Sequence, residues 1–416
     1  MDRHRSDESA ARFSAYLDEL ASEIGHASRV EPLRDYCAGL LLPGERKSVE
    51  PMAAITAPSR VSAQHQSLLH FVGKGGWSDD KLLARIRKLV LPKIEQHGAI
   101  AAWIIDDTGM PKHGRYSVGV ARQYCGQLGK QDNCQVAVSL SVANHHASLP
   151  VAYRLYLPQD WATDEARRRK VGIPDDIVFK TKPEIALEQI RWACDAGLPR
   201  GVVLIDAGYG ADTELRSSIS ALNLTYVVGI RANTSVDVIK EEPEENTKPA
   251  SVEAVARGLP ETAWLDVEWR DGTNAPLSGR FARLRVRPTH GGEKATAARA
   301  AEWLLIEWPK EEKKPTKYWL STLADDIDIV TMVDMAKLRW RIERDYLELK
   351  QEVGLGHFEG RGWRGFHHHA TLCIAAYGFL ISERGAFPPS GHRSRDIVKR
   401  PAVPAHYRPR GAAAAT

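Results

Sequence analysis

The sequence predicts an α/β fold in which a mixed sheet flanked by helices follows a helical N-terminal domain and is interrupted by a β-rich insertion. Two changes of pattern carry this prediction. Apolar residues recur at helical spacing up to about residue 95 and then occur in short, nearly continuous runs typical of buried strands. Beyond those runs, helical and strand-like segments alternate, as they do where crossover helices join parallel strands. A chain of 416 residues is long enough for two or three domains.

Five segments follow from these patterns. The first, 1–95, is helical, and its amphipathic runs are separated by turns with Pro and Gly. The second, 96–234, holds the first part of the sheet. In 235–316, charged, Pro-rich stretches flank strand-like pieces, which predicts an insertion. Segment 317–385 returns to the core with a strand and a helix, and 386–416 has the basic, low-complexity composition of a disordered tail.

The elements of the core can be placed in chain order. Three strands come first, then a helix, a strand, a helix and a strand, and these segments are 99–106, 134–144, 149–158, 183–197, 201–210, 213–222 and 225–231. The insertion contributes strand-like pieces at 263–270, 280–288 and 301–309. Because a strand, crossover and strand unit is right-handed and usually parallel, the strand at 201–210 is expected to lie parallel to and near the first strand.

Acidic residues end two of these apolar strands. Asp106 and Asp107 end the first strand, and Asp206 ends the strand of the crossover. The carboxyl ends of neighbouring parallel strands face the crevice where α/β proteins usually build their sites. A single Asp at such a place often only caps a turn or helix, but two acids from separate regions can meet here at one edge.

The segment from Arg339 to Val353 predicts an amphipathic helix with a charged strip. At about 100° per residue, one apolar stripe consists of Leu338, Ile342, Tyr346, Leu349 and Val353. A second apolar edge is formed by Trp340 and Leu347, and the outer face carries Arg341, Arg344, Asp345, Glu348, Gln351 and Glu352. Arg339, Glu343 and Lys350 lie between the two apolar flanks, so we expect them to point toward the protein. Burying these charges is costly unless they are paired or bind a metal or ligand.

Asp106, Asp206 and Glu343 therefore form a candidate site made of carboxylates. Oxygen ligands without a His or Cys cluster suit a hard cation such as Mg²⁺ or Mn²⁺. In a two-metal arrangement, such ions promote in-line attack on phosphorus. Arg339 and Lys350 would face the same pocket and could hold the phosphate backbone of a substrate.

Composition limits the class of protein. The net charge of +4 is mild, the longest apolar stretches are about half the length of a membrane span, and the first residues are charged. These features predict a cytoplasmic protein. The five cysteines are scattered without a C-x-x-C pair, so neither a disulfide framework nor a structural zinc site is indicated.

Basic residues gather at several places outside the acidic strip. The cluster Arg167 to Lys170 is a phosphate-binding signal of low specificity, since most charge runs are solvated faces. Lys112 and Arg122, in the Gly-rich segment after the first strand, could contact DNA phosphates or belong to a solvated loop. The triplet from His367 to His369 cannot bind one metal ion together, because adjacent helical residues diverge, and packing or phosphate contact is expected instead.

These residues together resemble the DDE transposases of bacterial insertion sequences, which have an RNase H-like catalytic domain. In one branch of that family, the helix of the third acid carries Y-x-x-R-x-x-x-E-x-x-x-x-x-x-K, and Arg339, Glu343 and Lys350 fit its last three positions. Ala336 occupies the tyrosine position. The runs IIDDTG and LIDAGYG resemble the motifs of the first and second acids, and GMPKHGRYSVGVARQYCGQLGK is similar to the DDE superfamily endonuclease subgroup. The resemblance extends from about residue 35 to 382.

The resemblance implies a catalytic set and its metal. Asp106 or Asp107, together with Asp206 and Glu343, would be both the catalytic residues and the ligands of Mg²⁺, for which Mn²⁺ can substitute. We favour Asp106 because it directly follows the apolar run. The side chains of successive strand residues point to opposite faces, so only one of the two acids joins the pocket easily. Asp107 stays the alternative.

The resemblance also implies a function. A transposase binds double-stranded DNA at the ends of its mobile element, hydrolyses the strand, and joins the 3′-hydroxyl to target DNA. End recognition would fall to the helical segment 1–95, two ends would be held by a homodimer, and the protein would be associated with the nucleoid. Two alternatives remain: a domesticated or inactive relative that binds DNA without cutting it, and an RNase H-like nuclease without strand transfer.

Overall fold

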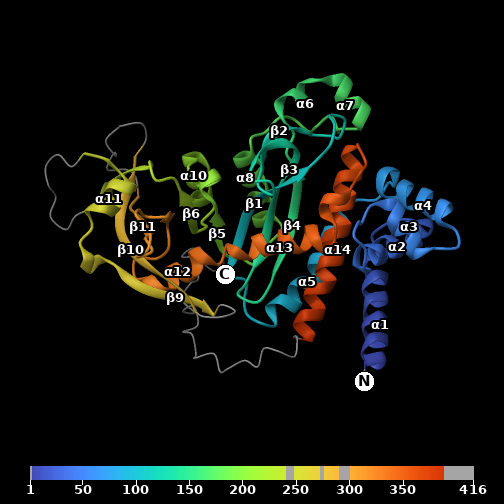
Figure 1. Ribbon diagram of the computed structural model, residues 1–416, viewed down its shortest axis with the longest axis horizontal. Coiled ribbons are helices and arrows are strands. Elements are labelled where there is room, and N and C mark those ends of the chain that lie inside the picture. Colours follow the sequence, from blue (N-terminus) through green and yellow to red (C-terminus); the bar gives the residue numbers. More distant parts are fainter. Residues whose placement is uncertain (1, 240–247, 272–275, 290–299, 388–416) are drawn as a thin grey trace, which may run out of the picture.

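The computed structural model describes residues 2–239, 248–271, 276–289 and 300–387 (Figure 1). The expected disordered tail lies, apart from its first two residues, outside the described residues. Three regions follow one another across the view in Figure 1: the N-terminal helices in blue, the core sheet, and the strands of the insertion in yellow. Within the described part of the chain, no helix is long and apolar enough to cross a membrane.

The core sheet has three antiparallel strands joined to two parallel ones. Its strands are β1 (Ala102–Pro111), β3 (Lys130–Ala143), β4 (Ser148–Leu155), β5 (Val202–Ile205) and β6 (Tyr226–Ile230). β3 pairs antiparallel with both β1 and β4, whereas β5 pairs parallel with β1 and β6. The first part of β3 also pairs with β2 (Ala121–Cys125). This is the mixed, RNase H-like sheet that the resemblance implied, and the predicted fold class is confirmed.

The strands of the insertion continue the same sheet. They are β7 (Ser235–Val238), β8 (Ala250–Ser251), β9 (Leu265–Asp271), β10 (Pro276–Pro288) and β11 (Glu302–Glu307), and the returning strand is β12 (Lys317–Ser321). β12 pairs antiparallel with β6, and the order beyond it is β11, β10, β7 and β8, with β9 paired to β10. The segment is therefore inserted in the sequence but joined to the core by strand pairing. The division into separate domains stays a prediction.

Helices cover both faces of the core sheet, and the N-terminal helices lie beside it (Figure 1). The N-terminal helices are α1 (Asp2–Ala21), α2 (Val30–Leu41), α3 (Val49–Thr56), α4 (Val61–Lys74) and α5 (Asp79–Glu95). The later helices are α6 (Gln159–Thr163), α7 (Glu165–Val171), α8 (Lys182–Asp195), α9 (Ala207–Gly210), α10 (Thr213–Ala221), α11 (Val252–Gly258), α12 (Ile329–Lys337), α13 (Trp340–Gln351) and α14 (Trp363–Ala386). Short 3-10 helices span Ala27–Arg29, Glu261–Ala263 and Leu355–His357. α14 packs against α2, α4 and α5, which ties the N-terminal helices to the core.

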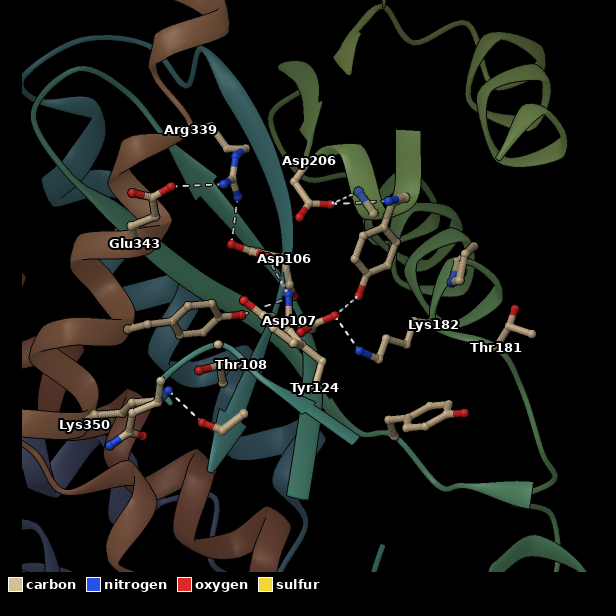
Figure 2. A pocket seen from close by; sticks show the side chains of 18 of the residues that line it. Asp106, Asp107, Thr108, Tyr124, Thr181, Lys182, Asp206, Arg339, Glu343 and Lys350 are labelled. Carbon is tan, nitrogen blue, oxygen red and sulfur yellow. Dashed lines mark hydrogen bonds and ion pairs between the residues drawn. The ribbon is translucent and has the colours of Figure 1, made fainter. Parts of the chain in front are cut away.

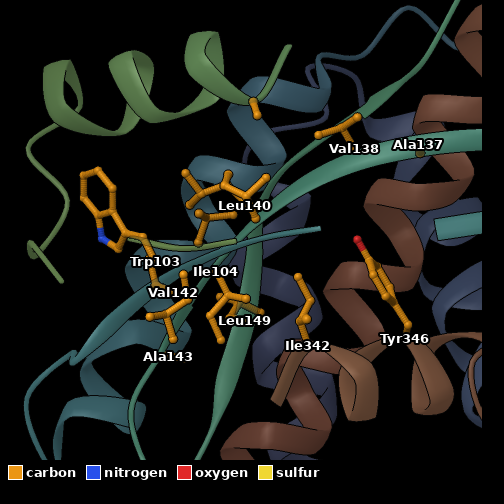
Figure 3. Close-up of a cluster of buried hydrophobic side chains, with 14 of the residues drawn as sticks. Trp103, Ile104, Ala137, Val138, Leu140, Val142, Ala143, Leu149, Ile342 and Tyr346 are labelled. Carbon is orange, nitrogen blue, oxygen red and sulfur yellow. The ribbon is translucent and has the colours of Figure 1, made fainter. Parts of the chain in front are cut away.

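The apolar core extends from the N-terminal helices to the strands of the insertion, and one part of it lies where α8 and α13 cover the central strands. Figure 3 shows Trp103 and Ile104 of β1 with Leu140 and Val142 of β3, between the green helix α8 and the brown helix that carries Ile342. These strand residues are buried, as the continuous apolar runs predicted. Because successive strand residues alternate, β1 presents one set of side chains toward α8 and the other toward α13.

The first strand is longer than the sequence predicted. β1 does not end at the acids but continues to Pro111, because β3 supplies hydrogen-bonding partners along its whole length, up to the pair of Pro111 with Cys134. The parallel neighbour β5 does end at Ile205. The acids therefore lie within β1, at the point where its parallel neighbour leaves the sheet.

Candidate functional site

The pairing of β1 with β5 brings two acids together. The last paired residues are Ile105 and Ile205, so Asp106 and Asp206 are the next residues on two adjacent parallel strands. Asp206 is also the N-cap of α9, and its Oδ1 accepts hydrogen bonds from the backbone N–H groups of Gly208 (2.9 Å) and Tyr209 (3.3 Å). Asp206 thus caps α9 and lies beside Asp106.

Asp106 is largely buried and faces the start of α13. Its Oδ2 accepts a hydrogen bond of 2.8 Å from Nη1 of Arg339, and its Oδ1 accepts one of 2.8 Å from the backbone N–H of Asp107. Burial raises the pKa of the Asp106 carboxyl, Arg339 lowers it, and the nearby Asp206 and Asp107 raise it; together these effects bring it to about 6. A carboxylate with two acidic neighbours in a poorly hydrated place favours a cation.

Asp107 points away from α13, toward α8. Its Oδ2 accepts hydrogen bonds from Nζ of Lys182 (2.9 Å) and from the hydroxyl of Tyr209 (3.0 Å). Figure 2 shows Asp106 turned toward Arg339 and Asp107 turned toward Lys182. Lys182 begins α8 directly after the capping residue Thr181. The two adjacent acids therefore have different partners, as strand alternation requires.

Glu343 reaches the site through Arg339. Nη2 of Arg339 donates a hydrogen bond of 3.0 Å to Oε1 of Glu343, so one guanidinium bridges Asp106 and Glu343. Contrary to the prediction from the helical wheel, the side chain of Glu343 is 64% exposed. It lies at the rim, because Arg339 at the N-cap of α13 takes the inner position.

The prediction of which α13 residues face the solvent is also partly wrong. Asp345 and Glu348 are buried, whereas Leu347, expected at an apolar edge, is exposed. The reason is that polar partners cover this face of the helix. Asp345 accepts hydrogen bonds from the hydroxyls of Ser148 in β4 and Tyr377 in α14.

Two further residues of α13 fix the helix to β1. The hydroxyl of Tyr346 donates to the backbone carbonyl of Asp106 (3.2 Å) and contacts the hydroxyl of Ser139 (2.7 Å). Nζ of Lys350 donates to the carbonyl of Gly109 (2.8 Å), and burial lowers the pKa of this ammonium. Lys350 thus points inward as predicted, and α13 is bonded to β1 at Asp106 and again at Gly109.

The acids line an open cleft of about 970 Å³. Its charged lining residues are Asp106, Asp107, Asp206, Glu343, Lys182, Arg231, Arg339 and Lys350, and its tyrosines are Tyr124, Tyr156, Tyr209 and Tyr346. The sequence reasoning missed Lys182, Arg231 and Tyr209. The signals were present: Lys182 stands inside a T-x-x-E capping box, and Arg231 directly follows a predicted strand. Cations around a carboxylate cluster suit a phosphate backbone as substrate.

The donor chemistry of the cleft fits a hard divalent cation. Asp106 and Asp206 offer only oxygen atoms, which Mg²⁺ and Mn²⁺ prefer. Among the described residues, however, no group of three or more His, Cys, Asp or Glu side chains could hold a metal ion. The positive charge between Asp106 and Glu343 is the guanidinium of Arg339.

Other residues singled out in the sequence lie outside the cleft. Nζ of Lys112 donates to the carbonyl of Phe358 (2.6 Å), and Arg122 is exposed on β2; neither lines the cleft. Of the histidine triplet, His368 and His369 are buried, and all three hydrogen-bond to backbone groups. Packing is therefore the structural role of the triplet.

Comparison with known proteins gives the family. The family model of the DDE superfamily endonuclease matches residues 19–276, and that of the transposase DDE domain matches 183–379. The chain is 31% identical over 315 residues to a probable transposase for insertion sequence element IS701 from Microchaete diplosiphon, covering 76% of this chain and 72% of that one. A chain of the piggyBac transposase synaptic complex with hairpin DNA aligns with a TM-score of 0.36 and 14% identity, over 79% of this chain and about half (52%) of the other. The protein therefore belongs to the DDE superfamily of endonucleases and transposases.

Proposed function

We propose that this DDE-type transposase cuts DNA at the ends of its own mobile element and joins the freed 3′-hydroxyl to target DNA. The observation that carries the proposal is the register of β1 and β5, which sets Asp106 beside Asp206 where β5 leaves the sheet. Glu343 stands across from them, joined through Arg339. Family membership supports the same reaction.

Three acids would hold the divalent ions in this scheme. Asp106 and Asp206 come from the sheet and are fixed by strand pairing and by capping of α9, whereas Glu343 comes from an exposed rim and is free to turn inward. Two Mg²⁺ ions would supply activation of the attacking oxygen and stabilisation of the leaving oxygen at phosphorus. Mn²⁺ shares this oxygen chemistry and would substitute.

The cations of the cleft would position the DNA backbone. Lys182, Arg231 and Lys350 line the cleft with the acids, so a phosphate that enters meets positive charge on several sides. Arg339 differs from these cations because it forms ion pairs with Asp106 and Glu343 and so neutralises them in the absence of a metal ion. With a divalent ion held by Asp106 and Glu343, Arg339 would be free to contact the substrate phosphate.

The DNA partners follow from this reaction. The element ends and the target are double-stranded DNA, and a homodimer would hold two ends together. We assign end recognition to the helices of 1–95, which α14 connects to the core, and the insertion would assist. Binding to chromosomal DNA would place the protein at the nucleoid.

The test is a reaction with the flanking DNA of the element. We expect end-labelled duplexes carrying these ends, incubated with the protein, Mg²⁺ and a target plasmid, to yield cut ends and strand-transfer products. Cutting without transfer would support the nuclease alternative, and end-specific binding without cutting, even in Mn²⁺, would support the inactive DNA-binding relative. Absence of both binding and cutting would overturn the proposal.

A further inference from the structure

A cluster of cations surrounds one exposed tyrosine outside the catalytic cleft. The carbon Cζ of Arg115 lies 5.6 Å from the centre of the Tyr116 ring, Nζ of Lys170 lies 5.7 Å from it, and Cζ of Arg361 lies 5.2 Å from it. These residues come from the loop between β1 and β2, from the end of α7, and from the loop before α14. We call Arg115, Tyr116, Lys170 and Arg361 the Tyr116 patch.

The fold holds these separate segments together by backbone contacts. The backbone N–H of Val118 donates to the carbonyl of Arg361 (3.0 Å), which joins the loop after β1 to the loop before α14. Nη2 of Arg167 donates to the carbonyl of Arg115 (3.4 Å), while its guanidinium lies 3.7 Å from the ring centre of the buried Trp161. The Tyr116 patch is thus fixed from two sides and does not depend on three long side chains meeting by chance.

Within the described part of the chain, no carboxylate pairs with the cations of the Tyr116 patch. Many surface cations there form ion pairs, such as Arg46 with Glu359 at 2.5 Å, whereas Arg115, Lys170 and Arg361 form none. Exposed like charges repel one another, and the face of a tyrosine ring offsets only about 0.5–1 kcal/mol of this per cation. An anionic ligand would relieve this repulsion.

The length of chain between the acids and the Tyr116 patch limits how far apart they lie. The loop of the Tyr116 patch continues directly from β1, and Pro111, the last residue of β1, is five residues beyond Asp106. At roughly 3.3 Å per residue, the end of β1 is about 17 Å from Asp106, and the loop residues from Pro111 to Arg115 add at most about 14 Å. B-form DNA rises about 3.4 Å per base pair, so the patch lies within about nine base pairs, or one helical turn, of the acids.

We propose that the Tyr116 patch binds the phosphate backbone of duplex DNA within one helical turn of the phosphate that is cut. This inference rests on the proposed function and adds the path of the DNA beyond the cleft. The three cations reach phosphates through charge and make no base-specific contact. Tyr116 acts as the platform that keeps them close together.

The main test compares a charge-removing variant with a charge-conserving one. The first carries Arg115→Gln, Lys170→Gln and Arg361→Gln, and the matched control carries Arg115→Lys, Lys170→Arg and Arg361→Lys. Each variant is titrated with an element-end duplex that extends about ten base pairs past the cut, and with one that ends about two base pairs past it. Affinity is measured by fluorescence anisotropy over a series of salt concentrations.

The expected loss is large and confined to the long duplex. Each lost phosphate contact reduces the steepness of log K against log salt by about 0.9. With equal binding at about 1 M salt, losing two or three contacts therefore weakens binding about 30- to 170-fold at about 0.15 M salt. We expect the control to keep the wild-type slope, Tyr116→Leu to give an intermediate loss, and binding of the short duplex to remain unchanged.

The outcomes separate this proposal from the proposed function. An unchanged salt slope for the charge-removing variant on the long duplex, or an equal loss on both duplexes, would overturn the role of the Tyr116 patch. If the wild-type protein itself binds neither duplex, the proposed transposase function fails instead. Cleavage of the short duplex by the charge-removing variant at the wild-type rate is expected, because the patch lies outside the cleft.

Discussion

Replacing Asp106 with asparagine is expected to abolish DNA cleavage and, in the same protein, to raise stability at high pH. Asparagine removes one of the charges that would hold the divalent ions, so cleavage should fall by at least about a hundredfold. The gain in stability has a different origin. Asp106 is a carboxylate that burial and two acidic neighbours disfavour, and asparagine relieves that cost.

The magnitude follows from the pKa of Asp106. Burial together with Asp206 and Asp107 raises this pKa from 3.8 to about 6, against the lowering effect of Arg339. The folded state therefore holds the proton more tightly than the unfolded state. Its contribution to stability is present below pH 4 and is lost as the pH rises toward 6. At pH 8, the ionised group costs about 3 kcal/mol, and Asp106→Asn should recover much of it, less the weakened bond to Arg339.

The assay is urea unfolding at pH 8 and pH 4 in EDTA, combined with cleavage of a labelled duplex in Mg²⁺. The matched variant is Asp107→Asn, which weakens the bonds from Lys182 and Tyr209 and should lose about 1–3 kcal/mol while retaining cleavage. Equal stability of Asp106→Asn and wild type at pH 8 would refute the electrostatic reasoning. Loss of cleavage in Asp107→Asn alone would make Asp107 the first ligand.

Two further predictions concern α13 and its N-terminus. The Arg339→Gln variant should bind Mn²⁺ about tenfold more tightly than the wild type, because the guanidinium no longer competes for Asp106. The affinity is measured by electron paramagnetic resonance titration at pH 8 without DNA, and an unchanged or weaker affinity would contradict this prediction. Asp345→Ala should cost about 2–5 kcal/mol in urea unfolding, because the hydroxyls of Ser148 and Tyr377 lose their acceptor. Asp345→Asn keeps Oδ1 and should cost less than about 1 kcal/mol, and an equal cost for both variants would show that these bonds are unimportant.

Local pattern was enough to predict the order of the core elements. The apolar runs that became β1 and β5 are followed directly by Asp106 and Asp206, and the crossover rule placed the two strands parallel. Strand alternation also predicted that Asp106 and Asp107 have different surroundings, which the bonds to Arg339 and Lys182 confirm. These features depend on neighbours in sequence or on general rules of chirality.

Features set by distant partners could not be predicted in this way. A helical wheel contains no information on what packs against it, so it placed Asp345 outside, although Ser148 and Tyr377 from other elements make its burial favourable. The length of β1 depends on pairing with β3, and the exposure of Glu343 depends on Arg339. Each of these errors comes from a contact between residues far apart in the chain or from competition for one inner position.

DNA cleavage by the Asp206→Cys variant tests most directly the central claim that Asp106 and Asp206 hold the metal ions of the cutting reaction. A thiolate is a poor ligand for Mg²⁺ but a better one for the softer Mn²⁺. We predict that Asp206→Cys binds the element ends with wild-type affinity, gives no cleavage in Mg²⁺, and recovers measurable cleavage and strand transfer in Mn²⁺. Cleavage of the ends by this variant in Mg²⁺ at the wild-type rate would contradict the account.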